Sequence, residues 1–141
     1  MLPRIGATTH CHDVLVVDDY HETREAIVAM LEAHRFAARG ASSGSDALAQ
    51  LEGGLRPCVV LLDVHMPGMD GWEFCERMKA LPEAANTPVV VLTADPAADI
   101  VRAARVGIRR VLRKPVEGRR LLDVVEIFCE RWRTPPESRS F

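Results

Sequence analysis

Short apolar runs alternate with longer amphipathic segments along this chain. Three four-residue runs contain only Val and Leu, at 14–17, 59–62 and 89–92. A continuous apolar run of this length, rich in β-branched residues, predicts a strand buried on both faces. Two weaker strands are predicted at 36–41, where Ala and Gly dilute the pattern, and around Val111–Leu112.

Between these runs, apolar residues recur at helical spacing. Ala26, Ile27, Met30 and Leu31 share one face of a helix predicted over 19–34. A turn at 42–45 offers N-caps for a helix that runs to about 52, and further helices are predicted over 72–81, 95–106 and 117–131. Strands that alternate with helices indicate a parallel sheet covered on both faces. We therefore expect a doubly wound α/β fold with five parallel strands.

The length and composition fit one such domain. The chain has 141 residues, of which 48% are hydrophobic and 27% are charged, as in ordinary soluble globular proteins. We expect the domain to cover residues 13–132. Residues 1–12 are expected to form a flexible leader, and the Pro/Ser-rich residues 133–141 a disordered tail.

The same sequence indicates a cytoplasmic protein. No apolar run reaches the ~18 residues that a membrane-spanning helix needs. Residues 1–13 lack the apolar core of a signal peptide. The cysteines show no spacing typical of a zinc or redox motif, so we expect them to be reduced, and the two in apolar surroundings to act as small apolar residues. They are Cys11, Cys58, Cys75 and Cys129.

Basic residues crowd one segment, although the net charge is only -2. They are Arg102, Arg105, Arg109, Arg110, Arg113, Lys114, Arg119 and Arg120. Such a cluster suits either nucleic acid or a solvated or protein-facing surface. Because aromatic residues do not interleave with it, we favour the second interpretation and disfavour a nucleic-acid partner.

Polar residues that could bind a ligand or take part in a reaction follow four of the predicted strands. Asp18 and Asp19 follow the first strand, Asp63 the third, Thr93 the fourth and Lys114 the fifth. The carboxyl ends of parallel strands share one edge of a sheet, and open α/β sheets bind their ligands there. We therefore expect three carboxylates, a hydroxyl and an ammonium group to lie close together.

Three neighbouring carboxylates repel one another unless a cation lies among them. Hard oxygen ligands suit Mg²⁺, which keeps several of its waters in proteins. Asp63 could then act as a nucleophile and form an aspartyl-phosphate. Lys114 and the metal would neutralise the phosphoryl charge, while the Thr93 hydroxyl donates to a phosphoryl oxygen.

These residues belong to four short motifs, and with them the chain resembles the receiver domain of two-component response regulators over residues 13–132. The motifs are Val16–Asp19, Leu62–Gly71, Leu92–Ala94 and Lys114–Pro115. The resemblance implies a flavodoxin-like sheet with the strand order 2-1-3-4-5. It also implies a signalling phosphoacceptor that catalyses only its own phosphorylation and dephosphorylation.

The resemblance further implies a role for each site residue. Asp63 would accept the phosphoryl group from a phosphohistidine of a sensor histidine kinase or phosphotransfer protein. Asp19, Asp63 and the His65 backbone carbonyl would ligate Mg²⁺, and Asp18 would hold the metal through water. Thr93 and Lys114 would sense the phosphoryl group.

The chain departs from the family pattern in two places. Receivers usually have Tyr or Phe three residues before the conserved Lys, where this chain has Val111. The usual rotation of an aromatic ring coupled to Thr93 is therefore impossible. Segment 106–110 is also atypical, so the face formed by the fourth helix, fifth strand and fifth helix is expected to contact an unusual downstream protein or a second copy.

Several alternatives stay open. The His65 side chain either modulates the lifetime of the phosphoryl group or is an ordinary exposed loop residue. The segment His10–His12 either binds a transition metal or belongs to the flexible leader. A degenerate receiver that serves as a binding scaffold, or a phosphohydrolase with an aspartyl nucleophile, would be an alternative function. The sequence also fits either a stand-alone receiver, with output by docking to another protein, or a fragment of a larger one.

Overall fold

The computed structural model describes residues 13–108 and 110–133, and within them five strands alternate with five helices. The elements are β2 (Asp13–Val17), α2 (His21–Ala33), β3 (Ala37–Ala41), α3 (Gly44–Glu52), β4 (Val59–Asp63), α4 (Gly71–Lys79), β5 (Val89–Thr93), α5 (Pro96–Arg105), β6 (Arg110–Arg113) and α6 (Gly118–Arg133). Every predicted strand and helix is confirmed. The predicted leader and residues 134–141 of the predicted tail lie outside the described residues, and α6 includes Arg133.

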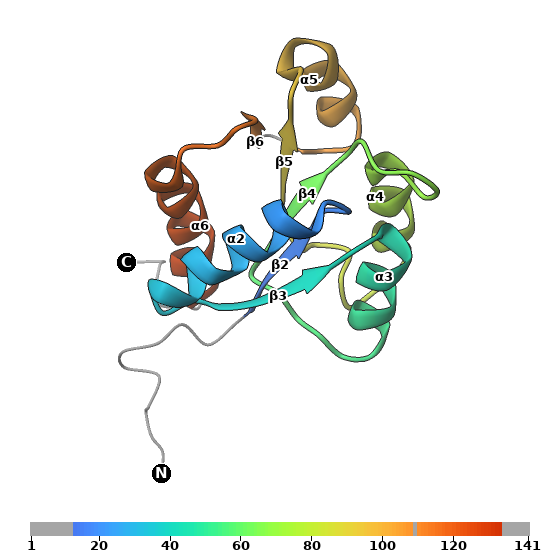
Figure 1. Ribbon diagram of the computed structural model, residues 1–141. Helices are drawn as coiled ribbons and strands as arrows, with labels where there is room; N and C mark the ends of the chain where they lie inside the picture. The colour runs from blue at the N-terminus through green and yellow to red at the C-terminus, as the bar shows by residue number, and fades with distance from the viewer. Residues whose placement is uncertain (1–12, 109, 134–141) are drawn as a thin grey trace, which may run out of the picture.

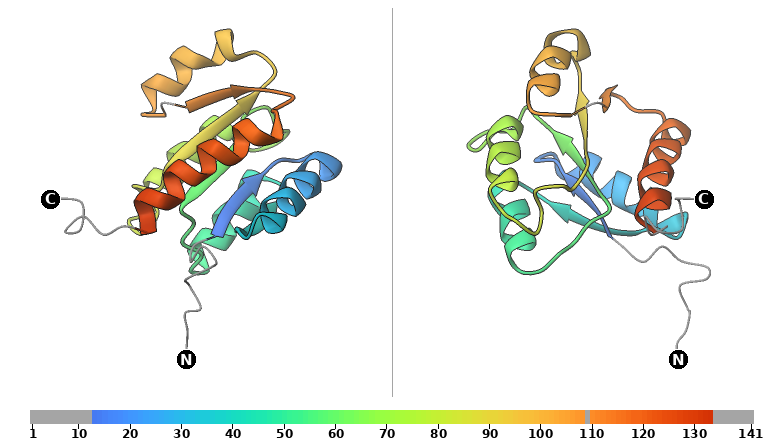
Figure 2. Two further views of the ribbon diagram at one scale, coloured as in Figure 1. Left: turned by 90° about the vertical axis from the view of Figure 1, so that its left-hand side faces the viewer. Right: turned by 180° about the vertical axis from the view of Figure 1, so that it is seen from behind.

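All five strands are parallel and lie in the order β3-β2-β4-β5-β6 (Figures 1 and 2). This is the expected order 2-1-3-4-5. β2 and β4 pair with Val17 opposite Leu62, and β4 and β5 pair with Asp63 opposite Leu92. The residues that follow these strands therefore meet at one edge of the sheet.

Two apolar cores separate the sheet from its helices. Leu15 and Val17 face the core covered by α3, α4 and α5, whereas Val14 and Val16 face the core covered by α2 and α6. Since successive residues of a strand point to opposite faces, a run of only Val and Leu is what a sheet buried on both sides requires. The two cores fix the strand ends that carry the polar residues.

Within the described residues, no helix is both long and apolar enough to cross a bilayer.

Tight packing holds the loop that follows β4. Asp70 caps α4 by accepting a hydrogen bond from the Glu73 backbone N–H at 2.9 Å. The Gly71 N–H donates to the Val64 carbonyl at 3.1 Å. A Cβ at position 71 would lie only 2.5 Å from the Val64 Cα, so no larger residue fits without movement of the backbone. The loop after Asp63 is thereby fixed against the start of α4.

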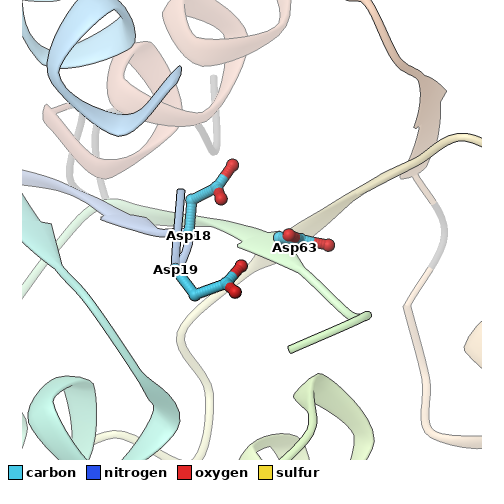
Figure 3. A group of neighbouring side chains, drawn as sticks. All are labelled: Asp18, Asp19 and Asp63. Carbon is cyan, nitrogen blue, oxygen red and sulfur yellow. The ribbon is translucent and has the colours of Figure 1, made fainter. Parts of the chain in front are cut away.

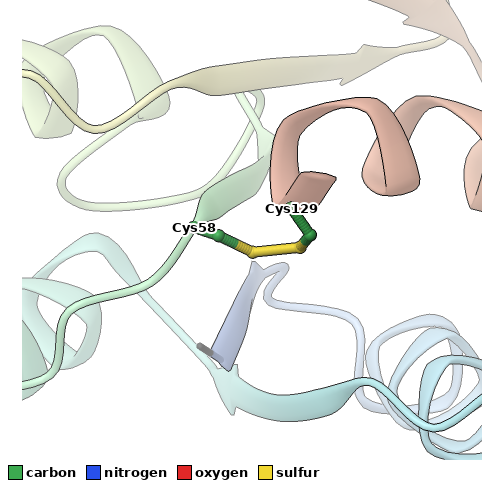
Figure 4. Close-up of a disulfide and its surroundings, with 2 residues drawn as sticks. All are labelled: Cys58 and Cys129. Carbon is green, nitrogen blue, oxygen red and sulfur yellow. A yellow bond between two sulfur atoms is a disulfide. The ribbon is translucent and has the colours of Figure 1, made fainter. Parts of the chain in front are cut away.

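Cys58 and Cys129 form a disulfide between the residue before β4 and helix α6, with their Cα atoms 5.4 Å apart (Figure 4). The expectation that these cysteines are reduced was wrong. The partners are 71 residues apart, and only the packing of α6 on the sheet brings them together. Cys75 is free and buried, and burial raises its thiol pKa to about 12, so it is an unreactive apolar residue.

The disulfide makes a direct prediction about thiol labelling. In protein unfolded without reductant, we expect an alkylating reagent to modify Cys75 and to leave Cys58 and Cys129 unmodified. After reduction, all three should be modified. Peptide mass analysis measures each site separately, and Cys75 is the internal control for complete unfolding. Modification of Cys58 and Cys129 before reduction would contradict the disulfide.

Candidate functional site

Three carboxylates meet at the carboxyl edge of the sheet, as Figure 3 shows. Asp18 and Asp19 directly follow β2, and Asp63 is the last residue of the neighbouring strand β4. One oxygen from each lies within 4.8 Å of the others. Asp18 and Asp63 are 1% and 7% exposed, whereas Asp19 is exposed to solvent. The structure thus brings the three predicted acids together, with one of them open to water.

The electrostatics of this cluster favour a bound cation. Negative charges at this separation repel one another, and burial removes the water that would screen them. Carboxylate oxygens from a few side chains, with one open side for water, are the donor set that Mg²⁺ uses in proteins. The residues present therefore fit a magnesium ion.

Asp63 lies between a backbone donor and a positive charge. Its Oδ1 accepts a hydrogen bond from the His65 N–H at 3.0 Å, and its Oδ2 is 3.3 Å from the Lys114 Nζ. Burial raises the pKa of Asp63 above its ordinary value, and the Asp18 charge adds to that rise, although the His65 N–H and Lys114 oppose it. A further positive charge would favour the ionised form that nucleophilic attack needs.

Lys114 connects two of the acids. Its Nζ lies 3.1 Å from the Asp18 Oδ2 and 3.3 Å from the Asp63 Oδ2. Burial alone would lower the pKa of Lys114, but the charges of Asp63 and Asp18 outweigh it and raise that pKa. The side chain is therefore a fixed cation at the site. The following peptide bond, Lys114–Pro115, is cis, and the Lys114 N–H donates to the Thr93 carbonyl at 2.8 Å.

The Thr93 hydroxyl lies at the same edge of the sheet, and it already makes two hydrogen bonds there. It donates to the Asp99 Oδ2 at 2.7 Å and accepts from the Asp95 N–H at 3.0 Å. Thr93 is 1% exposed. The sequence predicted this hydroxyl as a donor to a phosphoryl oxygen, and it missed the carboxylate that holds the hydroxyl here.

Asp99 is the functional candidate that the sequence analysis did not find. It lies on α5 and is 6% exposed, and its Oδ2 also lies 2.9 Å from the His65 Nε2. Burial by itself would raise the pKa of Asp99, but the hydrogen bonds from Thr93 and His65 outweigh it, so this pKa lies below its ordinary value. One signal was available, because Asp99 precedes the buried Ala103 by one helical turn and so lies on the inward face of α5.

The remaining expectations concern surfaces. In the basic cluster, every described side chain is exposed except that of Lys114, which is part of the site. Arg109 lies outside the described residues. Arg102 stacks over the Trp72 ring, with 5.2 Å from its Cζ to the ring centroid. Val111 packs against the core beneath α5. Segment 10–12 also lies outside the described residues.

The family model and the similar proteins of known sequence agree on one family. The model of the response regulator receiver domain matches residues 14–126. Protein PilH of Pseudomonas aeruginosa is 36% identical over 115 residues, which cover 79% of this chain and 93% of PilH. The response regulator PleD of Caulobacter vibrioides is 37% identical over 105 residues, which cover 74% of this chain and 23% of PleD.

A solved structure agrees with these relatives. The chemotaxis protein CheY4 of Vibrio cholerae superposes with a TM-score of 0.77 at 28% sequence identity. The match covers 83% of this chain and 98% of CheY4. The chain therefore spans nearly all of PilH and CheY4 but less than a quarter of PleD.

Proposed function

Because this chain belongs to the response regulator receiver domain family, we propose that it is a signalling phosphoacceptor in which Asp63 receives a phosphoryl group in a Mg²⁺-dependent reaction. The observation that carries the proposal is the convergence of Asp18, Asp19 and Asp63 within 4.8 Å, with the Lys114 ammonium 3.3 Å from Asp63. An acidic pocket with one fixed cation suits the transfer of a phosphoryl group, whose charge must be neutralised.

The metal would be held by the side chains of Asp19 and Asp63 and by the His65 backbone carbonyl, with Asp18 acting through water. When bound, Mg²⁺ supplies positive charge that offsets the acids and the incoming phosphoryl oxygens. The exposed position of Asp19 supports this assignment, since that carboxylate is accessible to a hydrated ion.

The reaction would begin at the Asp63 side chain. A carboxylate oxygen of Asp63 forms a bond to phosphorus, the phosphorus–nitrogen bond of the donor phosphohistidine breaks, and its electron pair returns to the imidazole ring. The His65 N–H hydrogen bond orients the Asp63 carboxylate. Lys114 would leave its contacts with Asp18 and Asp63 to pair with a phosphoryl oxygen, which carries more negative charge than either carboxylate.

The partners follow from this chemistry. The donor would be a sensor histidine kinase or a phosphotransfer protein. The output partner would contact the α5–β6–α6 face, where Val111 replaces the usual aromatic residue, or this face would pair two copies of the chain. In any larger protein that contains this domain, phosphorylation of Asp63 would control the activity of that protein.

Incubation with acetyl phosphate tests the proposal. We expect intact-mass measurement to show a gain of one phosphoryl group when Mg²⁺ is present and no gain when the metal is removed by a chelator. A folded protein that gains no phosphoryl group in Mg²⁺ would favour the alternative of a degenerate receiver used as a binding scaffold. Continuous hydrolysis of a generic phosphate ester would instead favour a phosphohydrolase.

A further inference from the structure

The hydrogen bond between Thr93 and Asp99 points to a residue role that the phosphoacceptor chemistry leaves unassigned. A threonine hydroxyl has one proton to donate. In this structure that proton goes to the Asp99 Oδ2 at 2.7 Å. A phosphoryl oxygen on Asp63 would need the same proton from Thr93. The two acceptors therefore compete.

Asp99 also joins the two loops that flank the site. Its Oδ2 lies 2.9 Å from the His65 Nε2, and the His65 N–H in turn donates to the Asp63 Oδ1. Thr93 ends β5, beside the strand that Asp63 ends. One carboxylate oxygen on α5 is thus connected to the strand end of Thr93 and to the loop after Asp63.

Loss of the Thr93 bond would have a structural consequence for α5. Asp99 is 6% exposed, and without the Thr93 hydroxyl its Oδ2 would keep only the His65 imidazole as a side-chain partner among the described residues, so the carboxylate would lose part of its stabilisation. Asp99 lies one turn into α5, after the Asp95 cap and Pro96. Movement of the first turns of this helix would admit water to replace the lost donor.

We propose that Asp99 is a positioning residue: it holds the Thr93 hydroxyl and the His65 imidazole before phosphorylation, and the phosphoryl group on Asp63 draws the Thr93 hydroxyl away and releases the first turns of α5. This inference rests on the proposed function of Asp63. It assigns to Asp99 the competing acceptor of the Thr93 proton.

Beryllium fluoride in the presence of Mg²⁺, which binds a carboxylate as a phosphoryl analogue, provides the test. Calorimetry would measure its affinity for the wild-type protein and for Asp99→Ala and Asp99→Asn. Because the competing acceptor is removed, Asp99→Ala should bind about 10-fold more tightly, which corresponds to one net hydrogen bond to a charged group. Asp99→Asn, whose amide oxygen still accepts from Thr93, should lie between the two.

The Thr93→Val background separates this role from general stability. There, replacement of Asp99 should leave the affinity unchanged, because no hydroxyl remains to be released. Asp95→Ala is the matched control, since it removes a carboxylate and a cap from the same helix without removing the acceptor of the Thr93 proton. An equal gain from Asp99→Ala in both backgrounds, or an equal gain from Asp95→Ala, would overturn the inference.

Hydrogen exchange supplies a second readout. Beryllium fluoride should accelerate amide exchange in the first turns of α5 in the wild type, whereas in Asp99→Ala the exchange should already be fast. Unchanged α5 exchange in the wild type, despite binding, would contradict the inference and leave the function of Asp63 intact. A wild-type protein that binds no beryllium fluoride would contradict both. Circular dichroism verifies that each variant is folded. If Asp99→Ala does not fold, the wild type is compared with Asp99→Asn instead.

Discussion

Replacement of Asp63 by Asn is expected to abolish stable phosphoryl labelling while the fold is retained. The amide has nearly the shape of the carboxylate, and its oxygen can still accept the His65 N–H hydrogen bond. It lacks the negative charge that makes the carboxylate a nucleophile and a metal ligand. Intact-mass measurement after treatment with acetyl phosphate and Mg²⁺ should therefore show no gain for Asp63→Asn.

The difference in unfolding free energy between this variant and the wild type, measured by chemical unfolding, should depend on pH in a defined direction. Burial raises the pKa of Asp63 in the folded protein above the ordinary value of 3.8. The folded state thus binds the Asp63 proton more tightly than the unfolded state, and the metal-free wild type loses this stabilisation as the pH rises through the raised pKa. Asn does not titrate, so Asp63→Asn should gain stability relative to the wild type between acidic and neutral pH.

Asp13→Asn is the matched control for both measurements. Asp13 begins β2 at the opposite edge of the sheet and pairs with Arg39, 3.4 Å away. This variant should be labelled to the wild-type level. Labelling of Asp63→Asn to the same extent as the wild type would contradict the assignment of the nucleophile.

Magnesium should stabilise the wild-type protein, and Asp19→Ala should remove most of that effect. A ligand that binds only the folded state at about 100 times its Kd contributes about 2.7 kcal/mol. In a domain of this size, that corresponds to a rise of roughly 8 °C in Tm. Because Asp19 is exposed, its truncation leaves no buried cavity, so the loss of the magnesium effect reports on metal binding.

Thermal unfolding with and without Mg²⁺, at constant ionic strength, measures this difference. Glu76→Ala removes an exposed acid of α4 that is not one of the three clustered carboxylates, and it should keep the full magnesium effect. An Asp19→Ala protein that gains as much Tm from Mg²⁺ as the wild type would show that the metal binds elsewhere.

The sequence predicted the fold because one physical signal dominates it. Three runs of only Val and Leu, at 14–17, 59–62 and 89–92, are buried on both faces, and their alternation with amphipathic segments is typical of a central parallel sheet. The acids that follow these runs then had to share an edge. Even the diluted segment around 37–41 forms a strand, since it pairs with β2 along its whole length.

Features that depend on side-chain partners were not predictable in the same way. The Cys58–Cys129 disulfide joins residues 71 positions apart, and no local spacing indicates it. Asp99 looked like an ordinary acid in the first turn of a helix. Its bond to Thr93 depends on how α5 is rotated over β5, which the packing of Ala103 decides. A helical-wheel comparison with Ala103 would have placed Asp99 on the inward face of α5, but it would not have shown the bond to Thr93.

The most direct test of the account is the position of the phosphoryl group in the chain. Protein labelled with acetyl phosphate would be reduced with borohydride, which converts an aspartyl-phosphate to homoserine, and then digested for peptide mass analysis. We expect homoserine at position 63 alone, and only in samples that contained Mg²⁺. Homoserine at another aspartate, or the same yield at position 63 without any divalent metal, would contradict a nucleophilic Asp63 in a metal-dependent acidic site.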